Sequence, residues 1–174
     1  LPVVEAGPDE VACGNVEAFD LSGWSPAGGT WEGPGIIDGV NGTFDPSIGT
    51  ADYDVFYWYT DPATGCADTT YKVVSVSPVP VAAFDLAPMG CTDAFVDLNN
   101  NSTGATSWQW DWGNTDMDLG IDPLYVYPDE GIFTVELLVT NDFGCQDSLS
   151  IDNEIIDPPS PAFDILPDEG CAPL

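Results

Sequence analysis

The sequence predicts an all-β protein made of two tandem β-sandwich domains. Short runs of alternating apolar and polar residues are separated by turn residues about every eight to twelve positions, and no helical period of useful length occurs. The motif Gly-Cys-x-Asp, followed by a hydroxyl residue, occurs at 65–69 and again at 144–148, an offset of 145 − 66 = 79 residues. A fixed period of this length indicates tandem copies of one structural unit.

The repeat sets the expected domain boundaries. We expect one domain at 1–77, a second at 78–157 and the truncated start of a third at 158–174, because 158–171 is similar to 78–91. We therefore interpret the chain as a segment of a longer protein. Pro78 and Pro80 lie at the first boundary, and because proline favours an extended path, they predict a short, stiff connector.

The first repeat has two informative stretches. Residues 24–36 combine Gly and Pro with two tryptophans, which predicts tight turns between short strands and tryptophans packed into or over the core. Residues 53–60 are expected to form a strand, 61–65 a turn, and 71–76 the last strand. By the period of two, the core face of the first of these strands carries Tyr53, Val55, Tyr57 and Tyr59.

The second repeat contains the clearest alternation. Strands are expected within 106–113 and 122–127, followed by a long strand that ends before Gly144. In this long strand one face is apolar and the other mostly polar, which is typical of a sheet with one buried face. The apolar face carries Phe133, Val135, Leu137 and Val139.

The five cysteines follow the same period. Within each repeat their spacing is nearly equal, 66 − 13 = 53 and 145 − 91 = 54, which predicts the intradomain disulfides Cys13–Cys66 and Cys91–Cys145 and leaves Cys171 to a third repeat. Free buried thiols or a metal site are the alternatives, but the chain has no histidine and no short Cys-x-x-Cys spacing. Disulfides indicate an oxidising compartment, so we expect an extracellular protein.

The charge excludes whole classes of partner. The chain has 30 acidic residues and one base, Lys72, for a net charge of −29. Phosphate contacts depend on Lys and Arg, so nucleic acid and anionic membrane surfaces are not expected partners. No apolar run is long enough to insert into a membrane. Because 44% of the residues are hydrophobic, the chain is expected to fold despite its charge, in a saline or calcium-bearing setting.

The second repeat resembles a known family. Residues 108–115 are similar to the motif W-x-W-D-F-G-D-G of the PKD domain, an immunoglobulin-like sandwich; 123–127 to its P-x-H-x-Y; and 131–144 to its G-x-Y-x-V-x-L-x-V-x-N-x-x-G. The first repeat resembles the immunoglobulin-like repeats beside PKD domains in large surface proteins of Bacteroidetes-type bacteria. Trp112, Asn114-Thr115 and Tyr125 depart from the PKD motif. The resemblance implies a cell-surface or secreted role in adhesion, gliding or matrix building.

Candidate chemistry is sparse. Without histidine or arginine, and with one lysine, most acid-base and nucleophilic mechanisms lack their residues, so we expect no enzyme. The acidic loop 114–122 is a possible calcium site, although its glycine is misplaced for an EF-hand; its oxygen ligands would be Asn114, Asp116, Asp118 and Asp122. Thr69 and Ser148, in Asp-Thr and Asp-Ser pairs, resemble Bacteroidetes O-glycosylation sites, with a structural hydroxyl as the alternative.

The leading hypothesis is a non-enzymatic repeat segment in the stalk or filament of an extracellular adhesin. Its expected partners are neighbouring repeats and other copies in a filament. One alternative is a binding module that holds a glycan or protein ligand on Trp31, Phe56 or Trp58; for the last two, cover by neighbouring side chains is the simpler interpretation. A further alternative is a pair of accessory domains of a secreted hydrolase.

Overall fold

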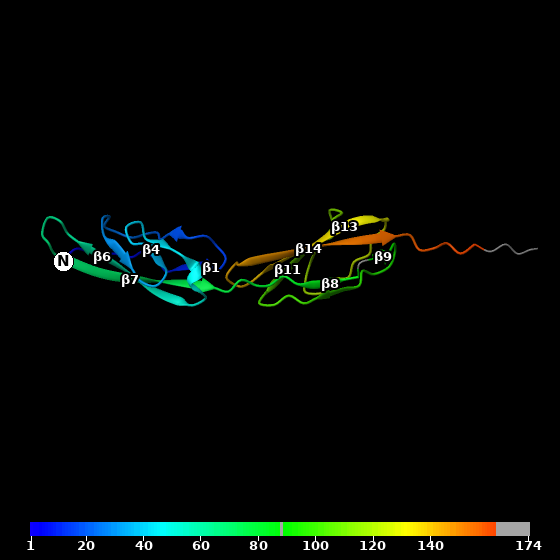
Figure 1. The fold of residues 1–174 in the computed structure, drawn as a ribbon, viewed down its shortest axis with the longest axis horizontal. Helices are drawn as coiled ribbons and strands as arrows, with labels where there is room; N and C mark the ends of the chain where they lie inside the picture. Colours follow the sequence, from blue (N-terminus) through cyan, green and yellow to red (C-terminus); the bar gives the residue numbers. More distant parts are fainter. Residues whose placement is uncertain (88, 163–174) are drawn as a thin grey trace, which may run out of the picture.

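The computed structural model describes residues 1–87 and 89–162. In this part of the chain the regular structure consists of β-strands and one short 3-10 turn, so the all-β prediction is confirmed. Figure 1 shows two β-sandwiches that follow one another along the long axis of the molecule. No helix among the described residues has the length and apolar character needed to cross a membrane. The third repeat predicted at 158–174 lies mostly outside the described residues.

The first sandwich packs a four-stranded sheet, in the order β1-β7-β6-β3, against a three-stranded sheet in the order β2-β5-β4. The 3-10 turn η1 (Pro46–Ile48) leads from the smaller sheet toward β6. The strands are β1 (Glu10–Cys13), β2 (Phe19–Asp20), β3 (Thr30–Glu32), β4 (Ile36–Asp38), β5 (Thr43–Phe44), β6 (Asp52–Thr60) and β7 (Ala67–Ser77).

The second sandwich packs a five-stranded sheet, in the order β12-β11-β13-β14-β9, against the pair β10-β8. Its longest strands, β13 and β14, form an antiparallel hairpin, as β6 and β7 do in the first sandwich. The strands are β8 (Phe84–Leu86), β9 (Met89–Cys91), β10 (Leu98–Asn100), β11 (Ser107–Asp111), β12 (Met117–Leu119), β13 (Gly131–Thr140) and β14 (Gln146–Ile156).

The period of two explains which side chains form each core. On β13, Val135, Leu137 and Val139 are fully buried, whereas Ile132, on the opposite face of the strand, is 73% exposed. The predicted core face of β6 is confirmed in the same way, because Val55 and Tyr57 are fully buried. Side chains that alternate along a strand point to opposite faces of the sheet, so each long hairpin closes one side of a core.

Aromatic side chains fill the second core. Trp110 and Trp112 are both fully buried, on the same face of the chain as it leaves β11, and their rings stack 6.1 Å apart. Phe84 of β8 packs its ring edge-on against Trp110 at 5.1 Å. Tyr127 is also fully buried, and its hydroxyl donates a hydrogen bond to the backbone carbonyl of Trp112 at 2.7 Å. Burial of its phenol raises the pKa of Tyr127.

The only Lys or Arg side chain of the chain, Lys72, is buried in the first domain. Lys72 of β7 is 1% exposed, and its Nζ lies 2.5 Å from Oε1 of Glu10 and 2.8 Å from the carbonyl of Ser22. The ammonium also lies 5.7 Å from the centre of the Trp31 ring. Burial raises the pKa of Glu10, but the hydrogen bonds from Lys72 and Ser22 outweigh it and hold that pKa below its usual value.

Both sandwiches carry one parallel edge strand at the same place. Strand β1 pairs in parallel with the end of β7, so that Cys13 lies opposite Ser77. Strand β9 pairs in parallel with the end of β14, so that Cys91 lies opposite Ile156. The first cysteine of each repeat therefore lies where its long hairpin ends.

Candidate functional site at the domain junction

A disulfide joins the two sandwiches to each other. Cys13, at the end of β1, is bonded to Cys145, which lies in the turn of the β13–β14 hairpin. The two Cα atoms are 5.5 Å apart, within the range that a disulfide spans. Cys145 is fully buried. The second domain thus inserts its hairpin turn beside the end of the first domain (Figure 1).

The predicted pairs Cys13–Cys66 and Cys91–Cys145 are therefore wrong. Cys13 lies beside Ser77 at the end of β7, whereas Cys66 immediately precedes the first residue of β7. An 11-residue strand at about 3.3 Å per residue separates the two cysteines by roughly 30 Å. A disulfide tolerates Cα atoms only up to about 7 Å apart, so this intradomain pair cannot form.

The same geometry separates the cysteines of the second repeat. Cys91 lies opposite Ile156 at the end of β14, and Cys145 precedes its first residue, Gln146. Equal spacing within each repeat identified equivalent cysteines correctly, but it carried no information about which end of the sandwich each one occupies. The pairing follows from end-to-end placement of the two domains.

Hydrogen bonds fasten the connector to both domains. On the first domain, the amide of Gly14 donates to the carbonyl of Ser77 at 3.0 Å. On the second, Val81 and Thr103 exchange two backbone hydrogen bonds, and the amide of Ala82 donates to Oδ2 of Asp147 at 2.9 Å. The chain between these anchors contains two prolines, so the connector has little freedom.

Asn141 links the hairpin of the second domain to this connector. Its Oδ1 accepts hydrogen bonds from the amides of Phe143 and Cys145, both at 3.0 Å, which shapes the turn. Its Nδ2 donates to the carbonyl of Pro78 at 2.8 Å. One side chain therefore orders the turn that carries Cys145 and binds it to the connector.

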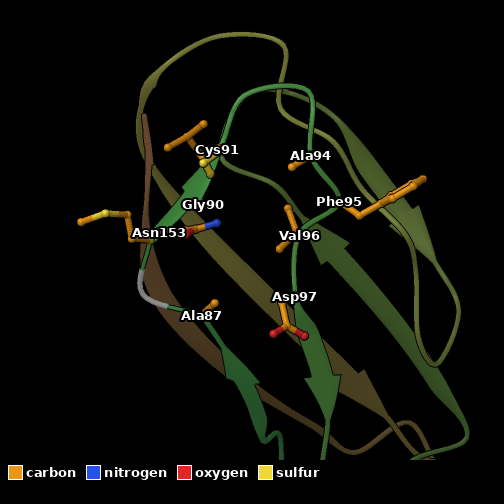
Figure 2. Close-up of a pocket in the computed structure, with 10 residues that line it drawn as sticks. Ala87, Gly90, Cys91, Ala94, Phe95, Val96, Asp97 and Asn153 are labelled. Carbon is orange, nitrogen blue, oxygen red and sulfur yellow. The ribbon is translucent and has the colours of Figure 1, made fainter. Parts of the chain in front are cut away.

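The two remaining described cysteines lie at the outer ends. Cys66 and Cys91 are both exposed and form no disulfide within the described part of the chain. Figure 2 shows Cys91 at the edge of a hollow that is also lined by Gly90 of β9, by Asn153 of β14 and by Phe95, which lies between β9 and β10. Asn153 is 1% exposed, and its Oδ1 has no hydrogen-bond partner among the described residues. The polar groups of the lining are the thiol of Cys91, the carboxylate of Asp97 and the amide of Asn153, and the remaining lining residues are apolar.

The three candidate ligand-binding aromatics lie in different environments. Trp31 is 1% exposed and packs against Tyr57 with ring centres 5.1 Å apart, so the prediction that it holds a ligand is wrong. Phe56 and Trp58, on the outer face of β6, are 40% and 48% exposed. Tyr71 of β7, which sequence reasoning had not selected, packs against Phe56 and extends this exposed aromatic patch.

The acidic loop 114–122 is organised by aromatic residues. Nδ2 of Asn114 donates to the hydroxyl of Tyr125 at 2.7 Å, and that hydroxyl donates to Oδ2 of Asp116 at 2.5 Å. Asp118 accepts a hydrogen bond from Nε1 of Trp112 at 3.0 Å. Burial, and then the Asp116 carboxylate, raise the pKa of Tyr125. Asp122 forms none of these hydrogen bonds, and the described residues contain no group of three or more acidic, Cys or His side chains arranged to hold a metal ion.

The two predicted glycosylation residues occupy equivalent exposed positions. Thr69 lies near the start of β7 and Ser148 near the start of β14. Oγ1 of Thr69 donates to the carbonyl of Tyr57 at 3.2 Å, which is the structural role that the sequence left open. Both side chains remain accessible from solvent, so their glycosylation stays a prediction.

The second domain matches a known domain family. Residues 75–156 match the family model of the PKD domain. The PKD1 domain of Vibrio anguillarum Epp is similar at 32% identity and a TM-score of 0.41, with 46% of this chain and 96% of that chain covered. The PKD1 domain of the Vibrio cholerae metalloprotease PrtV is similar at 30% identity and a TM-score of 0.40, covering 45% and 98%.

A multidomain structure also aligns over most of the length. The protocadherin gammaB7 EC3-6 cis-dimer structure covers 90% of this chain and 47% of that chain, at 10% identity and a TM-score of 0.37. No curated protein sequence matches the chain.

Proposed function

Because the second domain of this chain is a PKD/immunoglobulin-like domain, we propose that the chain is a non-enzymatic structural segment of a long extracellular protein, the stalk or filament of an adhesin. PKD domains are generally non-catalytic modules, and both the PKD domain and a disulfide fit an extracellular protein. The protein is proposed to lie at the cell surface or to be secreted. Adhesion and a source in Bacteroidetes-type bacteria belong to this proposal.

The observation that carries the proposal is the covalent junction. A stalk must transmit force and resist bending at each joint. Here the Cys13–Cys145 bond acts in parallel with the connector, so two covalent paths cross the junction in place of one. A pair of domains tethered only by a peptide linker would move relative to each other by default.

The charge suits an extended molecule. A net charge of −29 keeps such a chain soluble and repels one segment from the next. The only base is buried against Glu10, so the described surface presents no Lys or Arg to bind a neighbouring acidic segment directly. The partners proposed for the segment are the adjoining repeats, with lateral association of chains requiring cations.

Electron microscopy of the native protein that carries this sequence tests the proposal. We expect a thread of beads, each the size of one sandwich, that stays extended at physiological salt. A compact particle, or these two domains attached to a domain with hydrolase activity, would contradict the stalk. Treatment of the same sample with a reductant provides the control, since it should make the thread more flexible without shortening its contour.

The exposed aromatic patch favours a second function, binding of a glycan or protein ligand. Phe56, Trp58 and Tyr71 are 40%, 48% and 58% exposed on adjacent strands of one sheet. Aromatic faces of this kind stack on apolar faces of ligands. We expect a glycan array probed with the chain to give signals that the double substitution Phe56→Ser and Trp58→Ser removes. Ile132→Ser, at a 73% exposed position on β13, is the matched control and should keep them.

A further inference from the structure

The outer ends of this molecule repeat the two halves of its junction. At the Cys13 end of the first domain, the amide of Gly14 donates to the carbonyl of Ser77 at 3.0 Å. At the Cys91 end of the second domain, the amide of Thr92 donates to the carbonyl of Ile156, also at 3.0 Å. Both cysteines end a short strand that runs parallel to the last strand of the hairpin. Cys91 therefore presents its thiol from the same local structure as Cys13.

The hairpin ends match as well. The amide of Asn141 donates to the carbonyl of Cys145 at 3.0 Å, and the amide of Asp61 donates to the carbonyl of Cys66 at 2.8 Å. The residue before each cysteine is a glycine with φ in the left-handed region, 82° at Gly144 and 72° at Gly65. Cys66 therefore lies in the same kind of turn as Cys145, although its loop is one residue longer.

We propose that Cys91 and Cys66 each form half of a further interdomain disulfide of the same kind: Cys91 bonds the hairpin cysteine of a repeat that follows head to tail, and Cys66 bonds the strand-end cysteine of a repeat that precedes. A second copy of this two-domain unit, placed after the first, supplies both partners. In the junction that the structure contains, a strand-end cysteine is bonded to the hairpin cysteine of the following domain. The two exposed thiols are the same two cysteine types: Cys91 lies opposite Ile156 at the end of β14 (Figure 2), and Cys66 immediately precedes β7, at the end of that strand away from Ser77.

A tandem junction placed directly after Asp157 keeps the length of the connector. If a second copy begins directly after Asp157, then Leu1 and Pro2 of that copy take the places of Val79 and Pro80 in the connector. Cys91 of the first copy and Cys66 of the second are then 132 residues apart, which equals the separation of Cys13 and Cys145. The same connector length thus delivers the same pair of cysteines to the new junction.

The chemistry is a two-electron oxidation of two thiols. Each sulfur loses its proton, the S–S bond forms, and the two electrons pass to an external disulfide such as oxidised glutathione, which leaves as two glutathione thiols. A heterologous, head-to-tail contact between successive repeats of one extended chain leaves an unused half at each end, so it can be repeated along a filament. The result is a stalk in which every joint has a connector and a disulfide. This inference rests on the proposed stalk function, because it requires a neighbouring repeat at each end.

A tandem protein tests the inference. Residues 1–157 are followed directly by a complete second copy in one polypeptide, which is folded in a glutathione redox buffer; its remaining thiols are then blocked. The first copy ends after the last described strand, and the residues beyond Asp157 that the structure describes are exposed. Digestion at acidic residues without reduction, followed by mass spectrometry, identifies the linked peptides. We expect Cys91 of the first copy to be linked to Cys66 of the second, and Cys13 to Cys145 within each copy.

The matched variants make the result decisive. Cys91→Ser in the first copy should reduce the new linked peptide to background, whereas Cys91→Ser in the second copy should leave it unchanged. Recovery of both thiols in blocked form, with Cys13–Cys145 intact in each copy, overturns the proposal. Intradomain pairs, or loss of the Cys13–Cys145 bonds, overturn it as well, because they remove the junction on which it is patterned.

The two proposals fail in different ways. Repeats joined without this disulfide would still form a beaded thread in electron micrographs, so a negative tandem result leaves the stalk in place. A compact native particle, together with a linked Cys91–Cys66 pair in the tandem protein, would refute the stalk alone.

Discussion

The side-chain amide of Asn141 donates a hydrogen bond to the backbone carbonyl of Pro78, with 2.8 Å between the two atoms. The corresponding residue in the first repeat is Asp61, a carboxylate, which has no proton to donate and accepts hydrogen bonds from Ala63 and Thr64 within its own loop. The junction therefore uses a donor that the outer end of the first domain lacks.

Asn141→Asp isolates this donor. The variant keeps the oxygen that accepts from Phe143 and Cys145 but places a carboxylate against the carbonyl of Pro78. One hydrogen bond is worth about 0.5–1.5 kcal/mol, so the effective concentration of the Cys13 and Cys145 thiols for each other should fall about two- to tenfold. Equilibration of this disulfide with glutathione measures that concentration.

The control for this experiment is Gln146→Glu, which adds the same charge beside the hairpin. Gln146 is exposed and donates only to Oγ1 of Thr140, within its own domain. If both variants lower the effective concentration equally, the effect is one of charge and the hydrogen bond to Pro78 contributes nothing.

Acid should weaken the first domain through Glu10. Burial raises the pKa of Glu10, yet the hydrogen bonds from Lys72 and Ser22 lower it overall below 4.5. A lowered native pKa means that the carboxylate stabilises the fold fully above the unfolded pKa, and that this contribution is lost as the pH falls through the native pKa. We expect Glu10→Gln to be less stable than the wild type at pH 7 by about 1–3 kcal/mol.

The pH dependence distinguishes this ion pair from general charge repulsion. The difference between wild type and Glu10→Gln should shrink as the pH is lowered below 4.5, because the wild-type side chain also becomes neutral. Denaturant unfolding from pH 3 to pH 7 measures this difference, with Glu32→Gln, at an exposed position of β3, as the control. A difference that stays constant over this range would show that the charge of Glu10 does not stabilise the domain.

Thr115 is expected to be a point of backbone strain. Its φ of 80° lies in the left-handed region, which costs a residue with a Cβ about 1–2 kcal/mol. The PKD motif has glycine at the matching position, and Thr115 is exposed. Relief of this strain should therefore stabilise the second domain by about 1 kcal/mol in Thr115→Gly. The greater conformational entropy of glycine in the unfolded state reduces this gain.

Hydrogen exchange of β13 amides measures this change without interference from the first domain. Ser150→Gly, at an exposed position on β14, provides the contrast and should be destabilising, because glycine weakens the interior of a strand. Destabilisation by both substitutions would show that Thr115 is not strained.

Tyr127→Phe should weaken the second core. The Tyr127 hydroxyl is fully buried and donates to the carbonyl of Trp112, so its removal leaves that buried carbonyl without this donor. The expected loss is about 1–3 kcal/mol in denaturant unfolding of the second domain. Tyr71→Phe removes a hydroxyl from a residue that is 58% exposed and should change stability by less than about 0.5 kcal/mol.

Much of the fold could be predicted from residue types and their order. The alternation along 131–140 determined which side chains of β13 enter the core, because neighbouring side chains on a strand must point to opposite faces. The offset between Cys66 and Cys145 revealed the repeat, because equivalent turns need equivalent residues. Local constraints of this kind act over a few residues, so they can be predicted from a single sequence.

The site could not be predicted in the same way. The partner of Cys13 depends on which end of an 11-residue strand it lies beside and on how the next domain is placed, and neither is a local property. The period of two placed Trp58 on the outer face of its strand, where it is 48% exposed, but Trp31 lies in a stretch of Gly and Pro turns without such a period, and only the tertiary structure showed that it is buried. The amino-acid sequence alone determined the two repeats and the number of cysteines in each. Only the end-to-end packing of the two domains decided that the disulfide joins them, because a disulfide needs Cα atoms within about 7 Å.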